Sequence, residues 1–219
     1  MKNQLKCLVF LVLITFFLGC ATYRAYYDIV LKEVERPVEA KERYGEQKIT
    51  KVEEEGIFKY YFEDQMVEII WMPTSSQISF MLKNKTNHSI KIVWDEAAYV
   101  DENGESHRVI HSGVKYIDRN NPQPPSVVVR GGTISDIIIP SDKIYYVSGQ
   151  YGGWRKNPLF PTTSEEFDFF KKLVKKYVGK TIQVLLPLQI EDVINEYIFT
   201  FEIKDAEVRK PPGCISVIM

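Results

Sequence analysis

The chain has 219 residues, with 28 basic and 29 acidic side chains and a formal net charge of −1 at pH 7. A nucleic-acid-binding domain normally carries a basic excess gathered on one face, so we expect no nucleic-acid partner. The length suits one domain of moderate size. The aromatic content of 13% and the many β-branched residues favour a β-sheet.

The first 19 residues have the pattern of a secretory signal. Lys2 and Lys6 precede an apolar run that begins at Cys7 and ends at Leu18, and a glycine follows. A basic head, an apolar centre and a small exit residue are typical of such signals. At ~1.5 Å per residue the run is too short for the ~30 Å hydrocarbon core of a membrane. We predict a signal peptide over residues 1–19.

The segment Phe17-Leu18-Gly19-Cys20 resembles the lipobox of bacterial lipoproteins. The resemblance implies cleavage between Gly19 and Cys20, and acyl chains such as palmitate on Cys20 that hold the protein on membrane lipid. Several acyl chains on one residue make a stable anchor. Phe17 and Leu18 depart from the pattern, in which a leucine and a small residue are commoner. The alternative is an ordinary signal peptide that is cut within residues 21–25.

The residue after the cysteine bears on the membrane of destination. In lipoproteins of Gram-negative cells an aspartate there often signals retention in the inner membrane, whereas this chain has Ala21. The resemblance therefore implies the outer membrane. With Cys7 removed and Cys20 lipidated, Cys214 alone cannot form an intramolecular disulfide or a cysteine zinc site. We predict no cofactor.

Residues 20–55 are charged and contain few large apolar side chains. This composition favours a solvated tether that runs into a first strand. The alternative is an edge strand that begins directly after Tyr23. Residues 211–219 form a short tail.

Between residues 56 and 210, short apolar segments follow one another at a spacing near ten residues, which is an all-β pattern. Ile78, Phe80 and Leu82 alternate with more polar neighbours, as on a strand with one buried face. The predicted strands span 57–62, 66–72, 77–83, 89–94, 96–100, 106–110, 127–129, 134–139, 144–147, 181–186 and 197–203.

One amphipathic α-helix is predicted at about residues 164–178. Thr163 and Glu166 have capping-box spacing, and Gly179 can close the helix. The exposed lysines at 171–172 and 175–176 suit a helix that covers a sheet. The alternative is a helix that lies on anionic lipid and inserts its apolar face.

Strands in succession with one late helix predict an antiparallel β-sandwich over residues 56–210. The segment from Ile78 to Thr86 is similar to immunoglobulin-like modules of bacterial surface lipoproteins, in which an apolar strand ends in asparagine and a polar turn. The resemblance implies a mainly β, immunoglobulin-like sandwich that follows an N-terminal signal helix.

The histidines do not predict a metal site. On a strand, His107 and His111 would lie ~13 Å apart, too far to share one zinc ion. Ser112 follows His111, but no Gly-x-Ser-x-Gly elbow surrounds it. We therefore predict no catalytic residues.

A glycine-flanked aromatic loop is the candidate contact site. Tyr151, Trp154 and Arg155 lie between glycines and prolines, and aromatic side chains on a loop suit partner binding. The proline-rich loop from Asn120 to Pro125 is a second part of this surface. The alternative is that Tyr151 and Trp154 cap the core and the glycines only permit the turn.

These features predict a lipid-anchored envelope protein with a non-enzymatic interaction or structural role and an envelope protein as partner. The alternative is an extracytoplasmic hydrolase that acts on an envelope polymer. That alternative predicts a deep pocket in which His107 or His111 meets a carboxylate.

Overall fold

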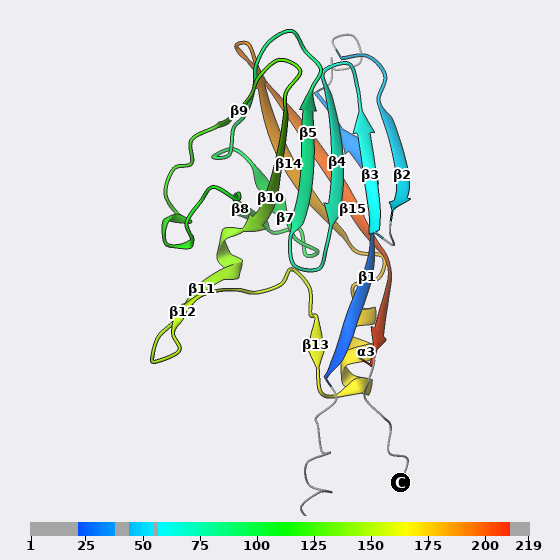
Figure 1. The fold of residues 1–219 in the computed structure, drawn as a ribbon. Helices are drawn as coiled ribbons and strands as arrows, with labels where there is room; N and C mark the ends of the chain where they lie inside the picture. The colour runs from blue at the N-terminus through cyan, green and yellow to red at the C-terminus, as the bar shows by residue number, and fades with distance from the viewer. Residues whose placement is uncertain (1–21, 38–43, 55–56, 211–219) are drawn as a thin grey trace, which may run out of the picture.

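The computed structural model describes residues 22–37, 44–54 and 57–210 (Figure 1). These ranges include the α-helix α3 (Phe167–Lys175) and the 3-10 helices η1 (Tyr116–Asp118) and η2 (Ser141–Lys143). The strands are β1 (Tyr23–Glu35), β2 (Lys48–Glu54), β3 (Ile57–Glu63), β4 (Val67–Pro73), β5 (Ile78–Asn84), β6 (Ile90–Ile92), β7 (Ala98–Val100), β8 (Ser106–Ile110), β9 (Ser126–Val128), β10 (Thr133–Pro140), β11 (Ile144–Val147), β12 (Gly153–Lys156), β13 (Thr163–Ser164), β14 (Thr181–Ile190) and β15 (Val193–Arg209).

Thirteen of these strands form one sheet. Its order is β13-β1-β15-β14-β7-β8-β10-β5-β4-β3-β2, with β6 paired to β14 and β9 paired to β6. β11 and β12 form a separate two-stranded ribbon. Each recorded pairing is antiparallel, which confirms the predicted mainly β, antiparallel class.

The long sheet curls, so that β3, β4 and β5 pack against β14 and β15. Trp71 of β4 has its ring centroid 4.6 Å from that of Phe199 and 5.6 Å from that of Phe201, both on β15. Phe62 of β3 lies 5.4 Å from Phe199. Figure 1 shows β2 to β5 in front of β14 and β15, with β7, β8 and β10 on the path between them. The main core therefore lies between the two halves of one sheet.

The alternation along the strands explains why this core forms. The predicted buried face of β5 is confirmed, since Ile78, Phe80 and Leu82 are at most 1% exposed. On β15, Tyr197 and Ile203 and the two phenylalanines between them are fully buried. Period-two apolar side chains thus face each other across the curl.

The expected tether is wrong for most of its length. β1 begins at Tyr23 and lies between β13 and β15, while β2 forms the opposite edge of the same sheet. The alternative, a strand directly after Tyr23, is the one observed. β1 buries Ile29, Leu31 and Val34, and its charged neighbours point to solvent, which is why composition alone suggested a tether.

Helix α3 is shorter than predicted and begins later. Thr163 and Ser164 form β13, so the expected capping box does not exist, and Glu166 at the N-cap makes no side-chain capping bond. Phe170 and Val174 are buried against Ala206 of β15. The helix therefore covers the sheet, and its apolar face is not available for insertion into lipid.

Several predictions lie outside the described residues. The signal peptide with its helix, the Gly19–Cys20 bond, Cys214 and the tail over 211–219 are among them. Within the ranges that are described, no helix has both the length and the apolar character needed to cross a membrane.

Candidate functional site

The β11–β12 ribbon projects from the body of the sheet (Figure 1). Its register runs from Ile144 opposite Lys156 to Val147 opposite Gly153. The Lys156 ammonium donates to Gln77 Oε1 at 2.7 Å, and partial burial lowers the pKa of this lysine. These contacts tie the base of the ribbon to the β4–β5 connection.

Glycines shape the turn of this ribbon. The Gly152 amide donates to the Gly149 carbonyl at 2.9 Å. A Cβ on Gly152 would lie 2.5 Å from the Val147 oxygen and 2.8 Å from the Gly149 oxygen. Gly149 has a φ of +109°, a region that side chains rarely adopt. The glycines are thus structural requirements of the turn.

Three tyrosines are exposed on the ribbon. Tyr151 is 84% exposed, Tyr146 is 61% exposed and Tyr145 is 41% exposed. The sequence singled out Tyr151 alone of these, because a strand with one covered face would hide either Tyr145 or Tyr146. A two-stranded ribbon that leaves the sheet leaves both faces partly uncovered.

Trp154 is half-buried and anchors the ribbon. It packs against a small cluster of Ile110, Ile139 and Ile144. Its ring lies 5.4 Å from that of Tyr146, and the Arg119 guanidinium lies over it at 4.7 Å. This cation–π contact fixes the root of the ribbon rather than leaving Trp154 as a free contact residue.

The other two predicted elements have different roles. Arg155 is exposed, and its guanidinium donates to the Tyr151 carbonyl at 3.1 Å, so it stabilises the turn. The proline-rich loop borders an open depression of about 320 Å³. Arg119, which precedes that loop, stacks on Trp154 and so links the loop to the ribbon. The lining residues are Gly113, Val114, Lys115, Asp118, Asn121, Pro122, Gln123 and Pro124.

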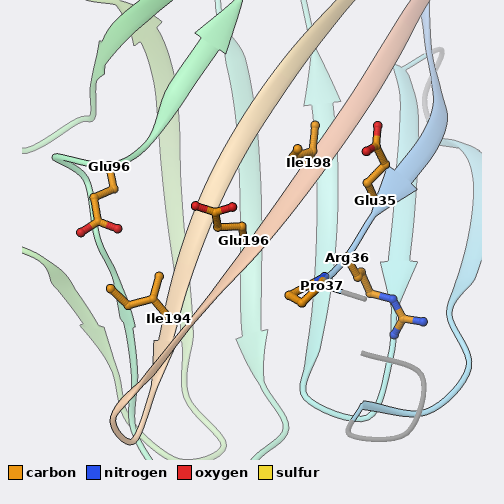
Figure 2. Close-up of a pocket in the computed structure, with 7 residues that line it drawn as sticks. All are labelled: Glu35, Arg36, Pro37, Glu96, Ile194, Glu196 and Ile198. Atoms are coloured by element: carbon orange, nitrogen blue, oxygen red, sulfur yellow. The ribbon is translucent and has the colours of Figure 1, made fainter. Parts of the chain in front are cut away.

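A second hollow, of about 380 Å³, lies near the start of β15 (Figure 2). Glu35, Glu96 and Glu196 line it from three separate segments, and the Arg36 guanidinium points away from them. Arg36 instead forms a buried ion pair with Asp64 at 3.3 Å. Among the described residues that line the hollow, three carboxylates face an open surface, and the one cation, Arg36, is paired with Asp64.

Asp64 joins that ion pair to the core. Oδ1 of Asp64 accepts hydrogen bonds from the amides of Met66 and Val67. The Tyr197 hydroxyl donates at 3.0 Å to Oδ2, the oxygen that also faces Arg36. Burial and the Asp64 carboxylate raise the pKa of Tyr197. The network satisfies each buried polar group and is structural.

His107 meets carboxylates across a hairpin. Its Nδ1 lies 3.3 Å from Asp142 Oδ2, and its Nε2 lies 3.5 Å from Asp101 Oδ2. The ligand atoms of Asp101, Glu105 and His107 all lie within 4.8 Å of one another. Such an imidazole with two carboxylates can ligate a divalent ion, and Asp142 would orient the ring. Spacing along one strand could not reveal this group, because the turn between β7 and β8 assembles it.

His111 faces a different set of groups. Its ring stacks on Trp94 at 4.4 Å, and its Nδ1 lies 3.2 Å from Asp136 Oδ2. The Ser112 amide donates to Asp136 Oδ1 at 2.8 Å, and its hydroxyl also bonds to this carboxylate. The serine therefore contacts the acid and not the imidazole, so the three residues do not form a nucleophilic relay.

No family model, no curated protein and no solved structure matches this chain.

Proposed function

We propose that this protein is a bacterial envelope lipoprotein, held on the membrane by acyl chains on Cys20, whose β domain presents the β11–β12 ribbon to an envelope protein. The exposure of Tyr151 and Tyr146 carries the contact role. Tyrosines offer a large contact area with few rotatable bonds, and exposed aromatic groups on a rigid base are typical of binding surfaces.

The rigid base is the second support. Trp154, Arg119 and the small isoleucine cluster hold the ribbon in place. Tyr146 lies opposite Trp154, and Tyr151 lies beyond both in the turn. A contact surface that is ordered before binding pays less conformational entropy on association. The proposed partner surface is therefore the pair Tyr146 and Tyr151, with the loop from Asn120 to Pro125 at its border.

We also propose that the curled sheet is a variant of the immunoglobulin-like sandwich. The packing of Trp71 on Phe199, which resembles the facing layers of a sandwich, supports this proposal. The sequence similarity of the segment from Ile78 to Thr86 is its second support.

The anchor is tested on the N-terminal peptide of the mature protein. Mass spectrometry of a membrane fraction should show acyl chains on an N-terminal Cys20, and Cys20→Ala should lose both the lipid and membrane association. Separation of inner and outer membranes then tests the outer-membrane destination proposed from Ala21. An unmodified terminus beyond Cys20 would exclude the anchor.

The contact role is tested in cells with a photocrosslinking residue, p-benzoylphenylalanine, at position 151. We expect adducts of defined mass from position 151 and none from position 49 on β2, where Ile49 is 38% exposed. Adding Tyr146→Ala to the position 151 variant should reduce those adducts while the melting temperature stays unchanged. Equal adduct patterns at positions 49 and 151 would contradict a contact role.

A further inference from the structure

We propose that the end of the domain made by the start of β1, by β13 and by the first turn of α3 rests directly on the bilayer, with Phe169 and Phe167 among the lipid headgroups. This proposal rests on the proposed lipidation of Cys20. The insertion considered for the helix sequence placed Phe170 and Val174 in lipid together with Phe167, and the burial of Phe170 and Val174 excludes it in that form.

The first step is the length of chain between lipid and fold. Tyr23 is the first residue of β1, only three residues after Cys20. At most ~3.6 Å per residue separates consecutive positions, so Tyr23 lies within about 11 Å of the acylated cysteine. The headgroup layer itself is several ångströms thick. A lipidated Cys20 therefore leaves no room for a spacer between the membrane and the start of β1.

The second step is that Tyr23 is fixed in the fold. It pairs with Ser164 of β13, and the next residue, Arg24, pairs with both Thr163 and Arg209. The start of β1 thus lies between two strands and cannot peel away without breaking the sheet. Figure 1 shows this point at one end of the molecule, beside α3 and the end of β15.

The third step is the set of side chains at that end. The Tyr23 ring lies 5.0 Å from that of Phe167, which is 37% exposed at the first position of α3. Phe169, two residues later, is 62% exposed. Phenylalanine is among the residues with which interfacial helices enter the boundary between headgroups and acyl chains, to a depth of ~5–10 Å. The bilayer is the apolar surface that the anchor brings to these two rings.

The charges around this end decide which lipid is needed. Arg24, Lys171 and Lys172 are exposed there, and so are three acidic side chains at positions 165, 166 and 168. Arg209, which is opposite Arg24, is also exposed and forms an ion pair with Glu207. These charges balance, so attraction to anionic lipid does not dominate. We infer that burial of aromatic surface drives the contact and that zwitterionic lipid suffices.

The experiment places a nitroxide label at position 169 of the full mature lipoprotein, as Phe169→Cys in a Cys214→Ser background, in phosphatidylcholine vesicles. The matched control is Ile194→Cys, 42% exposed near the start of β15. Along that strand, at ~3.3 Å per residue, Ile194 lies about 50 Å from Arg209, which pairs with Arg24 at the proposed membrane end. Collision rates with oxygen, which concentrates in lipid, are compared with those of a water-soluble nickel chelate.

We expect the ratio of oxygen to nickel collisions to be several-fold higher at position 169 than at position 194. The same ratio should be found when phosphatidylglycerol is added. Mass spectrometry of the same sample reports the acyl chains. A lipidated protein with an aqueous label at position 169 would overturn the membrane contact alone, whereas an unlipidated terminus would overturn the anchor and this contact together.

Two further outcomes also overturn the proposal. If position 169 contacts lipid only when phosphatidylglycerol is present, electrostatic attraction and not burial of the aromatic rings drives the contact. The label at position 169 could also be shielded from both probes and become accessible to the nickel chelate when residues 211–219 are deleted. That result would mean that the chain's own tail, and not lipid, covers this surface. Matching melting temperatures of the two labelled proteins serve as the folding control.

Discussion

Asp136 is a buried carboxylate held in its charged form. It is 7% exposed, and burial alone would raise its pKa. Hydrogen bonds from His111, from Ser112 and from the Ile137 amide outweigh that effect and lower the pKa below the usual range. This carboxylate ties β10 to the turn after β8.

We expect Asp136→Asn to lower the free energy of unfolding by about 2 kcal/mol at pH 7, since the variant loses hydrogen bonds to a charged group. The pKa of Asp136 is lowered in the folded state, so its contribution is present above the unfolded pKa of ~3.9 and is lost as pH falls through the folded value. Urea titrations from pH 7 to pH 3 should show the difference from wild type shrinking below about pH 4.

The control for that series is Asp168→Asn, an exposed residue on α3, which should change stability little at any pH. A difference for Asp136→Asn that is constant across the range would contradict a role for its charge.

Asn84 shows what sequence can and cannot indicate about one residue. It was recognisable as the end of an apolar strand before a polar turn. In the structure it is fully buried, donates from Nδ2 to the carbonyls of His88 and Val128, and accepts from the Thr86 amide. The bonds to Thr86 and His88 are local and follow from turn chemistry. The bond to Val128 depends on a contact 44 residues away and could not be predicted.

At the scale of elements, the alternation of apolar and polar residues located the central strands. Pairing with distant strands decided the bounds of the longer strands and the structure of β13. β15 was predicted over 197–203 but spans Val193–Arg209, because its charged second half is paired by β1 on one side. β13 was predicted as the start of the helix, with Thr163 as its cap and Ser164 as its first residue, since Thr163 and Glu166 have capping-box spacing. Pairing with Tyr23 and Arg24 holds Thr163 and Ser164 extended instead.

The turn of the β11–β12 ribbon gives an element-scale prediction. Gly152→Ala should unfold the ribbon locally, because the added Cβ would meet the Val147 and Gly149 oxygens. Hydrogen exchange should show lost protection over residues 144–156, with little change in the melting temperature of the domain. Ser148→Ala, an exposed position in the same turn, is the matched control. Unchanged protection in Gly152→Ala would mean that the turn adapts.

At the scale of the molecule, the curl was not predictable from local pattern. It depends on pairings such as Ile29 with Ile203, which lie far apart in the sequence, and on β7, β8 and β10, which continue the sheet between its halves. The sequence correctly indicated strands and antiparallel pairing. It carries no local signal for which pairs of strands become neighbours.

Because both halves share one core, they should unfold together. Trp71→Ala removes a fully buried ring that contacts Phe80, Phe199 and Phe201, and should cost about 4 kcal/mol. Circular dichroism and tryptophan fluorescence should still follow one transition. Phe58→Ala, at a partly exposed site on neighbouring β3, should cost far less. Two separate transitions in Trp71→Ala would indicate independently folding halves.

The pairing of β1 with β15 also has a mechanical consequence. Eleven residues of β1 pair with β15, from Arg24 opposite Arg209 to Glu35 opposite Ile198, with register shifts after Asp28 and after Leu31. Antiparallel hydrogen bonds run across the strand axis. A pull that enters at Tyr23 of β1 and is resisted on β15 near Ile198, opposite Glu35, therefore loads these bonds in shear, many at once, instead of opening them one after another. If the domain is anchored through Cys20 as proposed, this pairing would withstand tension that pulls on the start of the strand.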